Sequence, residues 1–106
     1  MDDRGFVIFQ TAVQGIRALA RDLRNKIRRG LDTVETLLSV YAPSSENDTV
    51  AYIRAVCQLT GLAPNAVIVA DELTLCALVE AIILHENGEQ PYPEDEIKDG
   101  VRQALV

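Results

Sequence analysis

Apolar residues run almost without interruption from Ala70 to Gly88, and this stretch dominates the hydrophobic pattern of the chain. It leaves hardly any polar face, which is typical of a helix buried on all sides in a core. Asp71 is placed to cap the first turn, and Gly88 supplies the left-handed conformation that often ends a helix. Four acidic residues within these 19 positions make the stretch a poor transmembrane candidate. We therefore expect residues 71–87 to form the central helix of the fold.

Four other segments show the periodicity of amphipathic helices. They cover residues 12–29, 34–41, 49–60 and 93–105. The capping signals that bound them are Thr11, Asp32 or Thr33, Asn47 or Asp48, and Pro93 at the starts, and Gly30 and Gly61 at the ends. The positions that this spacing turns inward are Val13, Ile16, Leu19, Ala20, Leu23, Ile27, Leu37, Leu38, Tyr41, Tyr52, Ala55, Val56, Leu59, Ile97, Val101, Ala104 and Leu105.

The sequence therefore predicts an all-α fold in a single domain, residues 1–106, with four to five short helices packed in a compact bundle around residues 71–87. Residues 62–69 are expected to be a linker with room for one helical turn, and residues 5–9 a strand or an extended lead-in. Apolar residues make up 48% of the chain and charged residues 25%, a composition typical of a globular protein.

The formal net charge of −6 conceals a strong asymmetry along the chain. Residues 1–30 carry seven basic and three acidic residues, a net charge of +4. Residues 31–106 carry three basic and thirteen acidic residues, a net charge of −10. This uneven distribution of charge favours a negatively charged partner at the basic end of the chain and a positively charged partner at the acidic remainder.

The basic residues of the first helix are spaced four, three and four positions apart, which places Arg17, Arg21, Arg24 and Arg28 in one row. The row spans about 16 Å at a rise of about 1.5 Å per residue, and Lys26 and Arg29 widen it. A solvated charged face is the simpler interpretation. Like charges at this spacing repel, however, so an acidic neighbour or a phosphate backbone would stabilise the row.

Glu86 is the candidate catalytic residue, because a carboxyl group at the end of a buried helix can have its pKa raised and act as a general acid. The alternative interpretation is that Glu86 and Asn87 fasten the helix end to the following loop. His85 is the only histidine, and no P-loop, GxGxxG or zinc-ligand spacing occurs, so we expect neither a metal nor a cofactor. Cys57 and Cys76 are expected to be reduced core cysteines.

Two segments resemble the virion-associated muralytic enzymes of phages, which have a lytic-transglycosylase or lysozyme-like fold. They are SSENDT at residues 44–49, with Tyr52 three residues on, and AIILHENGEQPY at residues 81–92. The resemblance implies that Glu86 is the catalytic acid. We expect the chain to lack the leading segment that closes the glycan groove in this family, and Tyr41 stands where the family usually has tryptophan. We therefore expect a repurposed, lysozyme-like remnant whose site is incomplete.

The whole chain, 106 residues beginning MDDRGF without a leader, resembles the small phage-encoded anti-CRISPR proteins that block type I-E systems. This resemblance implies a non-enzymatic inhibitor that acts in the host bacterial cytoplasm, without membrane contact, on the surveillance complex or its R-loop DNA. We expect the basic residues to bind the displaced single strand, and these residues are Arg17, Arg21, Arg24, Lys26, Arg28 and Arg29.

Two alternatives remain open at this stage. The acidic half could mimic DNA against a basic protein groove, through Glu94, Asp95, Glu96 and Asp99. The other alternative is a muralytic glycosidase with Glu86 as the general acid.

Overall fold

The computed structural model describes residues 11–41 and 46–106. Five α helices make up this part of the chain, and they are α1 (Ala12–Arg28), α2 (Val34–Tyr41), α3 (Glu46–Thr60), α4 (Glu72–Asn87) and α5 (Glu94–Leu105). The fold is all-α, as the sequence predicts. Within these ranges the β structure is limited to one isolated antiparallel bridge between Thr33 and Val67. The expected lead-in at residues 5–9 lies outside the described residues.

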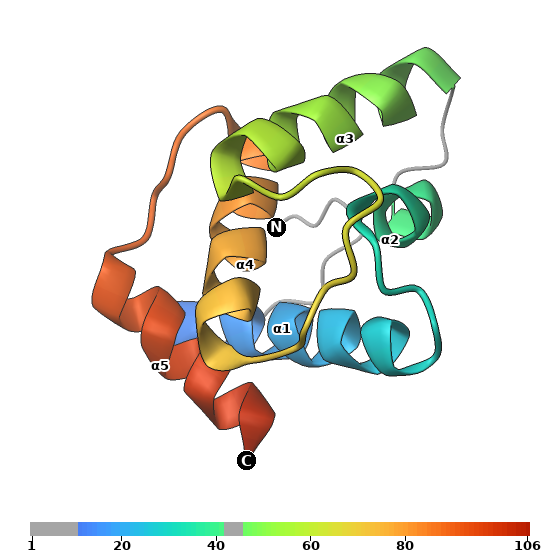
Figure 1. The fold of residues 1–106 in the computed structure, drawn as a ribbon. Helices are drawn as coiled ribbons and strands as arrows, with labels where there is room; N and C mark the ends of the chain where they lie inside the picture. Colours follow the sequence, from blue (N-terminus) through green and yellow to red (C-terminus); the bar gives the residue numbers. More distant parts are fainter. Residues whose placement is uncertain (1–10, 42–45) are drawn as a thin grey trace.

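The central helix, α4, packs against α1, α3 and α5 (Figure 1). Its buried residues cover more than half of its circumference, and they are Leu75, Cys76, Leu78, Val79, Ala81, Ile82 and Ile83. The remaining face carries the half-buried Ala77, Glu80 and Leu84. The Asp71 side chain caps the helix by accepting the Thr74 backbone N–H at 2.8 Å. Gly88 ends it at a φ of 77°, a conformation that favours glycine. Leu73, in the first turn, is 82% exposed, and His85, Glu86 and Asn87 of the last turn are exposed as well, so α4 is not buried on all sides as the sequence predicts.

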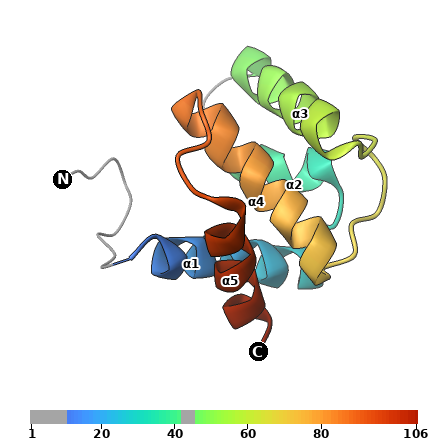
Figure 2. The ribbon, with the colours of Figure 1, turned by 90° about the vertical axis from the view of Figure 1, so that its left-hand side faces the viewer.

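Helix α5 crosses α1, and these two helices form the most extensive helix pair of the structure (Figure 2). The crossing is close because Gly100 of α5 faces Ile16 of α1. A Cβ atom at position 100 would lie 2.6 Å from Ile16 Cγ2 and 3.0 Å from the Val13 carbonyl oxygen. Ile97, Val101 and Ala104 of α5 are buried, as predicted.

Capping side chains fix the starts of the two N-terminal helices. Thr11 Oγ1 accepts the Gln14 backbone N–H at 3.1 Å and begins α1. Thr33, one of two expected caps, begins α2 by accepting the Thr36 N–H at 3.1 Å. The Thr36 hydroxyl returns the contact by accepting the Thr33 N–H at 3.2 Å, so two backbone donors are satisfied reciprocally.

Four expectations need correction. Helix α3 begins at Glu46 rather than at residue 49, and Leu59 near its end is 50% exposed. Ala55 is only half-buried. Pro93 is the N-cap of α5 rather than its first helical residue.

The linker at residues 62–69 contains no helix. It is held by backbone hydrogen bonds from Ile68 N–H to the Asp32 carbonyl at 2.6 Å and from Glu35 N–H to the Pro64 carbonyl at 3.0 Å. These bonds hold the linker against α2 and the residues just before it. They also satisfy backbone N–H and C=O groups of the linker, which would be paired with one another in a helical turn. None of the helices in the described ranges has the length and hydrophobicity needed to span a membrane.

Candidate nucleic-acid interface

Helix α1 separates its apolar and basic side chains sharply. Its buried residues, Ile16, Ala20, Leu23 and Ile27, line one stripe against the core. At 100° per residue, the directions of Arg17, Arg21 and Arg28 fall within about 40° of one another beside that stripe. The amphipathic pattern that buries one stripe of the helix therefore places these guanidinium groups on a common outer face.

Three arginines of α1 and its C-cap residue, Arg29, keep their charge available to a partner. Arg21, Arg28 and Arg29 are exposed, and Arg17 is half-buried. Within residues 11–41 and 46–106, no carboxylate lies within ion-pair distance of these four guanidinium groups. Like charges therefore lie close together without compensation by any carboxylate that the structure describes, an arrangement that an external polyanion would stabilise.

Arg24 does not share the environment of that row. Its Nη1 donates a hydrogen bond to the Ala104 carbonyl oxygen, 2.6 Å away in the last turn of α5. Its Nε is buried and makes no hydrogen bond with the residues described. The side chain thus joins α1 to the negative end of the α5 dipole, which assigns it a structural role.

Lys26 also differs from the exposed arginines. Its Nζ donates to the two carboxylate oxygens of Asp22 at 2.8 and 2.9 Å, one helical turn away. Four of the six basic residues that the sequence singles out are therefore the candidate interface, which we call the basic face: Arg17, Arg21, Arg28 and Arg29.

The acidic residues of α5 occupy a separate surface. Glu94, Asp95 and Asp99 are exposed and Glu96 is half-buried. Glu94 lies 3.9 Å from Lys98 of its own helix. In the described structure none of these four carboxylates forms an ion pair with the basic face.

Glu86 lies at the exposed end of α4 and contacts α3. The Tyr52 hydroxyl donates a hydrogen bond to Glu86 Oε2 at 2.9 Å. The Tyr52 ring, only 4% exposed, stacks on His85 with 4.1 Å between ring centroids. The sequence places Tyr52 in the core but gives no signal of its contact with Glu86, since the two residues are 34 positions apart.

The surroundings of Glu86 differ from those expected of a general acid. The carboxylate is exposed, so burial, the expected cause of general-acid character, is absent. Neither of the two cavities best defined by the described residues includes it. Asn87 donates from Nδ2 to the Ile83 carbonyl at 3.0 Å and so fastens the last turn of α4.

Both cysteines are free, as expected. Burial raises the pKa of the Cys57 thiol, and the nearby Glu35 carboxylate adds to that effect. Burial likewise raises the pKa of Cys76. Both thiols are therefore poor nucleophiles near neutral pH. The described residues contain no group of three histidine, cysteine or acidic side chains able to hold a metal ion.

Fold and surface together define a small all-α protein with a basic face on its first helix and an acidic remainder. No known family model matches the chain. The chain is similar to "Protein P5" of Pseudoalteromonas phage PM2, with 42% identity over 99 residues. The similar region covers 92% of this chain and 61% of the phage protein, so the chain spans about three fifths of that relative's length.

Proposed function

We propose that this protein is a non-catalytic phage protein that binds nucleic acid through the basic face of α1. The observation that carries the proposal is the set of four guanidinium groups without an ion pair among the described residues. Arg17 and Arg28 are separated by about 16 Å along the helix axis, which is a span suited to several consecutive phosphates. The similarity to a phage protein supports a role in infection.

The chemistry of the basic face favours contacts with the phosphate backbone rather than with bases. Residues 12–28 include no aromatic side chain, so α1 offers no platform on which bases would stack. Arginine contacts to phosphate position a protein on nucleic acid without reading its sequence. We therefore expect sequence-independent binding, with single-stranded DNA of an R-loop as the proposed target.

A charge-reversal experiment tests the proposed interface. Binding of a fluorescently labelled single-stranded DNA of about 20 nucleotides is measured by anisotropy at low salt. The paired substitution Arg21→Glu and Arg28→Glu should weaken binding by more than tenfold. The control variant Arg54→Glu changes an exposed arginine on α3, outside the basic face. Equal losses in both variants, or no DNA binding by the native protein, would refute the proposal.

The biological role that we propose is inhibition of type I-E CRISPR immunity by binding of the target-bound surveillance complex or its R-loop DNA. Phage plaquing on a host immune through such a system, with and without the expressed protein, tests it. We expect the native protein to restore plaques and the variant that combines Arg21→Glu with Arg28→Glu not to restore them. Unchanged immunity would remove this role even if DNA binding persists.

A second candidate function is a muralytic glycosidase, favoured by one specific contact. The hydrogen bond from Tyr52 holds the Glu86 carboxylate in a fixed position at the end of α4, as a catalytic group requires. Clearing of a peptidoglycan suspension that disappears with Glu86→Gln would support this function. No clearing at micromolar protein would exclude it, and Arg21→Glu provides the control variant, because it should leave clearing intact.

A further inference from the structure

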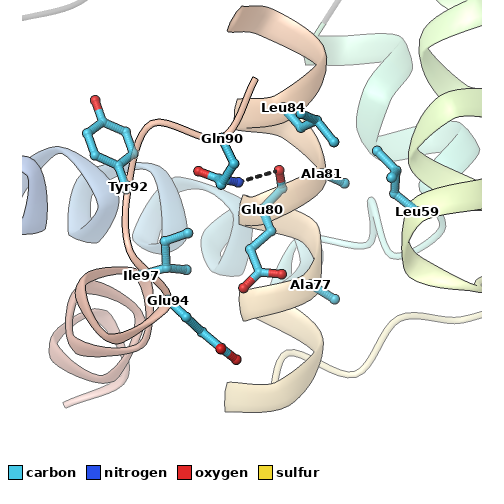
Figure 3. Close-up of a pocket in the computed structure, with 9 residues that line it drawn as sticks. All are labelled: Leu59, Ala77, Glu80, Ala81, Leu84, Gln90, Tyr92, Glu94 and Ile97. Carbon is cyan, nitrogen blue, oxygen red and sulfur yellow. Dashed lines mark hydrogen bonds between the residues drawn. The ribbon is translucent and has the colours of Figure 1, made fainter. Parts of the chain in front are cut away.

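A groove lies over the outer face of α4, bordered by the end of α3, by α5 and by the loop that joins α4 to α5 (Figure 3). Its volume is about 410 Å³. The floor is largely apolar and includes Ala77, Ala81 and Leu84 of α4. Leu59 of α3 lines it as well and is 50% exposed, which makes it one of the large apolar side chains that the described fold leaves uncovered. The groove therefore offers apolar surface that a partner would bury.

Two carboxylates border this apolar floor, and one of them, Glu94, lies 3.9 Å from Lys98 of its own helix. Figure 3 shows Glu80 projecting from α4 and Glu94 projecting from α5 into the space between the two helices. Glu80 is the one charged residue of α4 between Glu72 and His85. It is half-buried, and in the described parts of the chain its carboxylate has no ion pair. A half-buried carboxylate on an otherwise apolar helix favours a cation as its neighbour.

The loop over the groove is held in place rather than left loose. Gln90 donates a hydrogen bond from Nε2 to the Glu80 backbone carbonyl at 3.2 Å. Tyr92, from the same loop, is half-buried against the core and lines the groove. The opening between α4 and α5 is therefore formed before any partner binds, which reduces the ordering that binding requires.

We propose that this groove docks a basic amphipathic helix of a partner protein. Apolar side chains of the partner would cover the floor near Leu59 and Leu84, and a lysine or arginine would lie between Glu80 and Glu94. Binding of an amphipathic helix in an apolar groove is a common mode of recognition, and the carboxylates select a basic partner. The proposal does not depend on nucleic-acid binding, because no residue of the groove belongs to the basic face.

A second copy of this chain fits the groove less well. Its basic face carries arginines but no exposed large apolar residue, since those of the described chain all lie outside α1. Arginines alone would meet the two carboxylates and leave the floor uncovered. The occupant must therefore combine apolar and basic side chains on one helix face.

The test uses a labelled probe peptide of about 14 residues, composed of leucine and lysine in helical spacing, and its leucine–glutamate counterpart. Anisotropy should show binding of the lysine peptide, weakened about three- to tenfold by Glu80→Gln. Glu89→Gln removes the same charge from an exposed loop residue outside the groove and should leave affinity unchanged.

The apolar floor is tested separately with Leu59→Ala, which removes an exposed side chain and should leave the fold intact. It should weaken peptide binding several-fold, whereas Val67→Ala, 68% exposed and outside the groove, should not. Equal affinity of Glu80→Gln and Glu89→Gln would overturn the proposal, as would equal binding of the glutamate peptide. If the protein dimerises in the absence of peptide and Glu80→Gln abolishes the dimer, the groove binds a second copy of the chain, and the proposal is overturned.

Discussion

Arg24 of α1 donates a hydrogen bond to the backbone carbonyl of Ala104 in α5 across 2.6 Å. The contact joins two helices that are 80 residues apart in sequence, and it places a positive charge at the carbonyl end of α5. Arg24 and Arg21 have the same side chain and lie on the same helix. Their roles differ because α5 reaches one of them and leaves the other exposed.

Replacing Arg24 should therefore cost stability, whereas replacing Arg21 should not. Arg24→Met keeps the aliphatic stem but leaves the Ala104 carbonyl without its charged donor, a loss of about 1–2 kcal/mol in the free energy of unfolding. Arg21→Met, at an exposed position, should change it by less than about 0.5 kcal/mol. Urea denaturation measures both values. Equal stabilities of the two variants would contradict the structural role of Arg24.

Gly100→Ala should destabilise the protein even though alanine favours helices. The added methyl group would lie 2.6 Å from Ile16 Cγ2, and the Val13 carbonyl limits any movement away. We expect a loss of about 1–3 kcal/mol from overpacking, larger than the gain of about 1 kcal/mol from helix propensity. Asp99→Ala, at the exposed neighbouring position, is the control. Greater thermal stability of Gly100→Ala would mean that α1 and α5 are packed less closely than described.

Asp71 makes the stability of the protein depend on pH in the acidic range. Its pKa is lowered from the ordinary value of 3.8, chiefly because the carboxylate accepts the Thr74 backbone N–H. A carboxyl group whose pKa is lower in the folded than in the unfolded chain stabilises the fold. Its contribution is complete at pH values above the pKa of the unfolded chain, and it is lost as the pH falls through the pKa of the folded chain. The stability advantage of the native protein over Asp71→Asn should therefore be constant above about pH 5 and shrink as the pH falls from there to about pH 2. A constant difference in urea unfolding across that range would argue against the charged cap.

Features fixed by local interactions could be predicted from the sequence. The caps at Thr11 and Asp71 and the end of the central helix at Gly88 depend on neighbouring residues, and each is found where expected. The end of α3 shows the limit of this approach. Leu59 has helical spacing with Tyr52 and Val56, but half of its surface is exposed because the groove opens beside it.

The division of the arginine row could not be predicted, because it depends on where α5 lies against α1. At 100° per residue Arg24 lies nearest of the four to the buried stripe, but spacing alone does not show that its guanidinium reaches a backbone carbonyl of α5. One signal was present in the sequence: Gly100 interrupts the last helix, and an isolated helical glycine often marks a close approach of another element. The Tyr52–Glu86 hydrogen bond has no such signal, since it arises from the packing of α3 on α4.

The salt dependence of DNA binding tests the central claim most directly. The affinity for labelled single-stranded DNA is measured by anisotropy between about 50 and 200 mM salt. If the four guanidinium groups of the basic face each neutralise a phosphate, the slope of log K against log salt should be about −3, and Arg21→Glu with Arg28→Glu should reduce it by at least about half. An unchanged slope in that variant, or binding that salt does not weaken, would contradict the assignment of α1 as the nucleic-acid interface.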